Sequence, residues 1–88
     1  MKFRILHETK ERMRVHMIGE RISCEQADIL LYYLHNIKEI QAVKVYDRTA
    51  DVTISYIGER ADIIHILRRF QYENVKYQLD CLKILEEN

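Results

Sequence analysis

Hydrophobic residues follow two spacings along this chain, and each spacing predicts a different kind of element. Over residues 12–17, Met13, Val15 and Met17 alternate with polar residues, which is typical of a strand with one buried face. The same alternation predicts further strands over 40–46, 52–56 and 75–79.

A segment before the first main strand, residues 2–7, shows the same alternation. Phe3 and Ile5 have the parity of the apolar residues in 12–17, and the polar run Glu8–Glu11 separates the two stretches. The two stretches can form one long bent strand or two short ones. We expect a lead-in followed by the main strand.

Apolar residues recur every three or four positions in two other segments, and this spacing predicts amphipathic helices over 23–36 and 59–70. Ser23 can cap the first helix, and Gln26, three residues on, can complete a capping box. Between the strands 40–46 and 52–56, the polar run Asp47–Asp51 predicts a hairpin connection.

The predicted order of elements is βαββαβ, with residues 1–80 forming one domain and 81–88 a tail or the start of a linker. This order predicts an α+β, ferredoxin-like sandwich: a four-stranded antiparallel sheet with two helices on one face. The predicted core contains residues from strands and helices: Val15, Leu34, Val45, Ile54, Leu67 and Val75.

Charge and composition restrict the class of partner. Lys plus Arg equals 14 and Asp plus Glu equals 14, so the balance argues against duplex nucleic acid or an anionic membrane as a partner recruited by bulk charge. Two cysteines form no disulfide framework, and no apolar run approaches the roughly 20 residues of a membrane span. We expect a cytoplasmic domain that binds no nucleic acid and does not insert into a membrane.

Catalytic patterns are not evident. The predicted solvent side of the central strands offers no aromatic platform for RNA, and 17–23 contains only Gly19 where an acylphosphatase-like anion loop needs more glycine. No nucleophile triad, paired-carboxylate site or P-loop is recognisable. The domain is therefore predicted not to be an enzyme.

Cys24 is the residue that most suggests chemistry, because it follows the predicted cap Ser23 at a helix N-terminus. Such a position lowers a thiol pKa and favours a soft-metal thiolate, although the residues alone favour the plainer interpretation of Cys24 as a small, partly buried first-turn residue. His16 is the nearest additional ligand, but its parity places it opposite the core face, which favours a solvated histidine. A site of His7 with Cys81 at the other end of the sheet is a remote alternative.

The chain resembles the heavy-metal-associated domain, whose signature G-M-T-C-x-x-C follows the first strand. Ile22–Cys24 stands where M-T-C would, but Ala27 replaces the second cysteine, and Ile40–Tyr46 matches the family's second strand. A divergent branch without the cysteine pair, the N-terminal domain of some bacterial heavy-metal-translocating P-type ATPases, resembles the chain more closely. That likeness rests on Ile5–Lys10, Arg12–His16, Ala27–Leu30, Tyr32–Leu34 and Val43–Thr49.

The resemblance implies a non-catalytic regulatory or docking domain of such an ATPase, whose partners are other domains of the transporter or a second copy. It implies Cu(I), Zn(II) or Cd(II) as metals, which Cys24 alone would bind weakly, since one thiolate lacks the chelating gain of a pair. The alternative is a free-standing self-association module without metal function. That module would pair an exposed edge strand and use the surface of Tyr32, Tyr33, Tyr46 and Tyr72.

Overall fold

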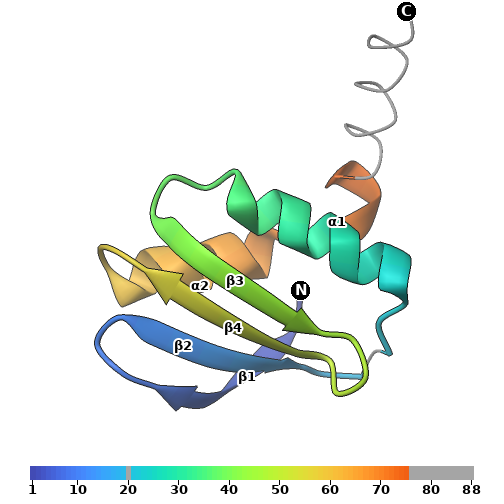
Figure 1. Cartoon of the computed structure of the whole chain (residues 1–88), viewed down its shortest axis with the longest axis horizontal. Coiled ribbons are helices and arrows are strands. Elements are labelled where there is room, and N and C mark those ends of the chain that lie inside the picture. The colour runs from blue at the N-terminus through green and yellow to red at the C-terminus, as the bar shows by residue number, and fades with distance from the viewer. Residues whose placement is uncertain (20, 76–88) are drawn as a thin grey trace, which may run out of the picture.

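The computed structural model describes residues 1–19 and 21–75 and has the predicted fold class. Within these residues, four antiparallel strands form one sheet in the order β1-β2-β4-β3, and the helices lie behind it in Figure 1. The elements are β1 (Phe3–Glu8), β2 (Arg12–Met17), α1 (Cys24–His35), β3 (Ile40–Tyr46), β4 (Asp51–Tyr56) and α2 (Arg60–Arg69). The molecule is an α+β sandwich of the ferredoxin-like type.

The edge beside β2 is occupied by β1, the segment expected to be a lead-in. Phe3 lies opposite Met17 and Glu8 opposite Met13, with a register irregularity between Ile5 and His7. The described chain therefore runs ββαββα. The lead-in is a full strand because the short turn 9–11, closed by a Thr9 N–H to Arg12 carbonyl bond of 2.8 Å, folds it directly onto β2.

The prediction of a strand that begins at Val75 is wrong at that residue. Val75 lies in a helical turn, where its N–H donates to the carbonyl of Gln71 at 3.4 Å, and Val75 is buried against the core. An apolar residue in a helical turn can be buried as well as one in a strand, so alternation over so few positions could not distinguish the two. The remainder of that predicted strand, 76–79, lies outside the described residues, as does the predicted tail 81–88.

One face of the sheet packs on the helices. Strands β2 and β4 contribute Met13, Val15, Val52 and Ile54 to the core at 0 % exposure. The core residues predicted from sequence are buried except for Val45, which is half-buried on the edge strand β3. Helical core residues are Ile29, Leu30 and Leu34 from α1 and Ile63 and Leu67 from α2.

Both helices begin and end close to the predicted positions. Ser23 caps α1: its hydroxyl accepts from the Gln26 N–H at 3.1 Å, and the Gln26 side chain accepts from the Ser23 N–H, which completes the predicted capping box. Helix α2 carries Asp62 in its first turn and Arg68 and Arg69 in its last, the charge order that suits the helix dipole. No helix within 1–19 and 21–75 is long and apolar enough to cross a membrane.

Candidate functional site

The face of the sheet away from the helices carries most of the polar chemistry of the strands. We call it the open face, and the strand registers place on it Arg4 and His7 of β1, Arg12, Arg14 and His16 of β2, Asp51, Thr53 and Ser55 of β4, and Ala42, Lys44 and Tyr46 of β3. Four cationic side chains thus share a surface with one carboxylate, Asp51. The other described carboxylates lie on the helices, on the connections or on the core-side parity of β1, so a formal net charge of zero conceals a basic face.

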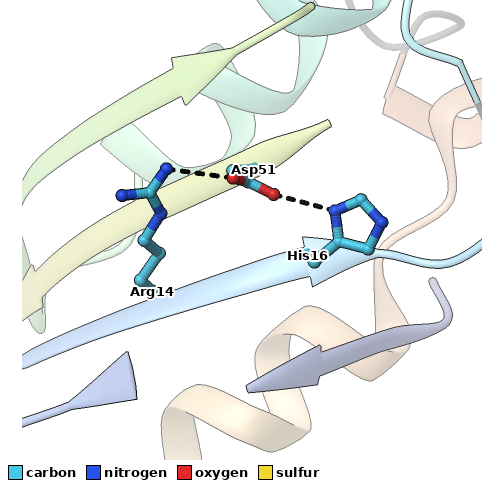
Figure 2. A network of polar contacts seen from close by, with 3 residues as sticks. All are labelled: Arg14, His16 and Asp51. Carbon is cyan, nitrogen blue, oxygen red and sulfur yellow. Dashed lines mark hydrogen bonds and ion pairs between the residues drawn. The ribbon is translucent and has the colours of Figure 1, made fainter. Parts of the chain in front are cut away.

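Asp51 joins two of the basic residues of β2. Its Oδ2 accepts from Arg14 Nη2 at 3.0 Å, and its Oδ1 lies 2.8 Å from His16 Nδ1 (Figure 2). The Asp51 side chain is only 9 % exposed, although it belongs to the open face. Burial alone would raise the pKa of this carboxyl, but the hydrogen bonds from His16 and Arg14, with the charge of Arg14, outweigh it and hold that pKa below its usual value.

Tyr46 holds two cations over the same face. The guanidinium carbon of Arg14 lies 5.5 Å from the centre of the Tyr46 ring, and Lys44 Nζ lies 5.3 Å from it, so both make cation–π contacts. Arg14 is therefore fixed between the Asp51 carboxylate and an aromatic ring. A guanidinium held in this way loses little freedom when it binds a further anion.

Beside this cluster the open face is hollowed to about 540 Å³. Among the described residues, the hollow is lined by His7, Arg12, Arg14, Ala42, Val43, Lys44, Tyr46, Thr53 and Ser55, none of which is a carboxylate. A larger hollow of about 990 Å³ lies between the N-terminus and Phe70–Glu73, but it mixes Lys2 and Arg21 with Glu73 and has no single sign of charge. The smaller hollow is the one suited to an anionic group.

Cys24 lies at the first residue of α1, as predicted, and is exposed. Its thiol donates to Asp47 Oδ2 at 3.5 Å. This hydrogen bond, together with the negative charges of Asp47 and Asp28, raises the pKa of Cys24, so the carboxylates oppose the lowering expected from the helix N-terminus. A thiol held protonated is a poor ligand for a soft metal.

The predicted ligand candidates do not converge. His16 lies on the open face, as its parity predicted, and its close partner is Asp51, whereas Cys24 contacts Asp47. His7 faces the open side opposite Arg14, and Cys81 lies outside the described residues. In 1–19 and 21–75 no three His, Cys, Asp or Glu side chains gather into a group that could hold a metal ion. These donors do not fit a chelating site, and weak metal binding by Cys24 stays a prediction.

Sequence reasoning missed the basic face, although it assigned its central residues to the solvent side. Alternation placed Arg12, Arg14 and Thr53 there, but it could not show that Lys44 and Tyr46 of β3 lie alongside them. Two of the tyrosines expected at the surface, Tyr33 and Tyr72, instead pack on Phe70 with ring centres 4.9 and 4.6 Å apart. The basic face could have been detected by counting, in each strand, the cationic residues at the positions that alternate with the core residues.

Comparison of the chain with protein-family models, with curated proteins and with solved structures gives no match.

Proposed function

We propose that this domain is a non-catalytic docking module, which binds an acidic protein surface through the open face. The observation that carries the proposal is the gathering of Arg4, Arg12, Arg14 and Lys44 on one face with a single carboxylate among them. Complementary charge across an interface steers association and selects the partner. The sole carboxylate, Asp51, is already paired within the face, so it does not repel an acidic partner.

The open face supports docking better than the edges of the sheet do. Self-association by edge pairing needs a regular strand edge, but β1 is irregular between Ile5 and His7 and β3 between Ile40 and Ala42. Such irregularities disrupt the ladder and protect an edge from pairing. The open face, in contrast, presents two central strands, and neither α1 nor α2 lies over them (Figure 1).

We further propose, on the resemblance to ATPase N-terminal domains, that the partner is another domain of a heavy-metal-translocating P-type ATPase. The coding frame tests this part of the proposal. Transmembrane spans and a phosphorylatable D-K-T-G sequence downstream would support it. A stop codon after Asn88, with no transporter gene nearby, would contradict the ATPase association and leave a free-standing binding module.

Docking itself is tested by titrating the chain into each purified cytosolic domain of that ATPase in a calorimeter, at low and at high salt. We expect binding that weakens with salt and is lost in the double variant Arg12→Glu, Lys44→Glu. The matched control is the double variant Arg68→Glu, Arg69→Glu, which reverses two exposed charges in the last turn of α2 and should bind as the wild type does. Equal loss in the control, or binding that is insensitive to salt, would refute docking by the open face.

Self-association is measured on the same material by light scattering. Homodimers that form without metal and survive the Arg12→Glu, Lys44→Glu double variant would favour the edge-pairing alternative over docking.

A further inference from the structure

We infer that the hollow on the open face is a small-molecule site for a polyphosphate-bearing anion. This inference goes beyond the proposed docking, because it requires no protein partner. The site comprises Arg12 and Arg14 of β2, Lys44 of β3, and the hydroxyls of Thr53 and Ser55 of β4.

The lining offers hydrogen-bond donors and no negative charge. Arg12 lies opposite Ser55, and Lys44 lies opposite Thr53, so each hydroxyl has a cation from a neighbouring strand directly beside it. Directly opposed residues on adjacent strands are about 5 Å apart, a spacing that lets one oxyanion contact a hydroxyl and a cation together. The two pairs share β4: Ser55 is paired with Arg12 on β2, and Thr53 is paired with Lys44 on β3.

The number and type of cations favour phosphate over a single carboxylate. Arginine presents a planar fork that binds phosphate oxygens in pairs, and lysine adds a mobile point charge. Arg14 already shares its charge with Asp51, but one carboxylate would still neutralise only one of the other two cations, Arg12 and Lys44, whereas a diphosphate carries enough charge to meet both and to contact Arg14 as well. The cavity, about 540 Å³, also falls within the range of roughly 300–1,000 Å³ typical of small-molecule sites.

Tyr46 sets how the ligand is recognised. Because Arg14 and Lys44 already lie over its ring, the ring positions cations and does not offer a free platform for a nucleobase. Recognition should therefore depend on the phosphates, and a base attached to them should add little.

The test is a calorimetric titration of the full 88-residue chain with pyrophosphate, ADP and adenosine at constant ionic strength, without any protein partner. We expect saturable binding of pyrophosphate, binding of ADP within about threefold of it, and none of adenosine. Arg12→Gln and Lys44→Gln should each weaken pyrophosphate binding about tenfold, the loss of one hydrogen bond to a charged group. Ser55→Ala should weaken it by a smaller factor without any change of charge.

The control Arg4→Gln removes the same charge from the same face, but Arg4 is not part of the lining. It should leave pyrophosphate affinity within about twofold of wild type, as expected for a screened charge outside the site. Circular dichroism melts confirm that each variant is folded, and Lys44→Gln serves if Arg12→Gln is not.

Three results would overturn the inference: no saturation by pyrophosphate, equal weakening by Arg4→Gln and Arg12→Gln, or a Ser55→Ala variant that binds as wild type does. Binding of a single-stranded ribo-oligonucleotide that tightens with length, while pyrophosphate fails to saturate, would likewise overturn it in favour of a nucleic-acid surface. Because these titrations contain no protein partner and the docking titrations contain no phosphate, failure of one proposal is distinguishable from failure of the other.

Discussion

The two faces of this sheet are built from the same strands and follow different rules. In β4, Val52 and Ile54 are fully buried against the helices, while Thr53 and Ser55, which alternate with them along the strand, border a basic hollow. The helix-covered face is held by apolar burial, which is insensitive to the identity of the neighbours as long as volume is kept. The open face depends on particular pairs, such as Arg14 with Asp51, and a change in either partner alters the chemistry.

Asp51 combines a property of each face: it is polar and paired, but it is also buried. It points to the open face, yet its side chain is nearly as buried as the core, and its hydrogen bonds with Arg14 and His16 replace those it would make to water. The two faces therefore differ in what burial requires. On the open face a buried charge is tolerated only while its hydrogen-bond and ion-pair partners are present, whereas the apolar side chains of the helix-covered face need no such partners.

The largest expected difference between the two faces is in the stability cost of substitutions at two adjacent residues of β4. Ile54→Ala should lower the free energy of unfolding by about 3 kcal/mol, because it removes methylenes from a closed core. Ser55→Ala, on the other face, should change it by no more than about 0.5 kcal/mol. Urea unfolding measures both, and Ile54→Val, expected to cost about 1 kcal/mol, serves if the alanine variant does not fold. Similar losses at the two positions would mean that the open face also contributes packing.

Asp51→Asn should have the next largest effect, about 2 kcal/mol at neutral pH, because Arg14 and His16 lose a charged acceptor. The folded-state pKa of Asp51 is lowered, so its contribution is present above the unfolded pKa of about 3.9 and is lost as pH falls through the folded value. The stability gap between wild type and variant should therefore shrink below about pH 4.

Urea unfolding at neutral pH and at successively lower pH measures that gap. The control is Asp28→Asn, because Asp28 is an exposed carboxylate of α1 and does not belong to the open face. A gap that stays constant down to low pH would show that the carboxylate charge is not what stabilises Asp51.

Ser23→Ala tests how much a single hydrogen bond, the N-cap of α1, contributes to the stability of the helix-covered side. Removal of the N-cap oxygen of α1 should cost about 1 kcal/mol, while Ser23→Asp, which keeps a capping acceptor, should cost much less. Thermal unfolding followed by circular dichroism measures the pair. If both variants lose the same stability, packing and not the cap holds the start of α1.

Asp47→Asn should have the smallest effect on stability, but it should change the reactivity of Cys24. Without the Asp47 carboxylate the pKa of Cys24 falls toward its usual value, so more thiolate is present at a given pH and alkylation by iodoacetamide becomes faster. Mass spectrometry of the Cys24 peptide reports the rate separately from that of Cys81. Asp28→Asn should give a weaker acceleration, and an unchanged rate in Asp47→Asn would show that the hydrogen bond does not govern the thiol.

Much of the fold could be predicted from local patterns. The capping box of Ser23 and Gln26 fixed the start of α1 to the residue, because its hydrogen bonds join residues three apart in sequence. Alternation gave the core face of β2, since side chains on one face of a strand recur every second residue. The ends of α2 also lay close to the predicted ones.

The identity of the fourth strand was harder, because two segments had the same pattern. Residues 3–8 and 75–79 both alternate, and either could occupy the edge beside β2. The structure places 3–8 there, joined to β2 by a turn of three residues, for which the entropy of loop closure is small. Val75, at the other candidate, is helical. Alternation reports that one face is buried and does not report which neighbour a strand pairs with.

What the sequence determined by itself was the class of each element and its buried face, because both depend on residues close together along the chain. Only the tertiary structure decided which residues each exposed side chain contacts. Arg14, Tyr46 and Asp51 are brought together by the register of three strands, and Cys24 meets Asp47 across 23 residues. Charge clusters and thiol chemistry depend on distances of a few ångströms between distant segments, and those distances exist only once the sheet has formed.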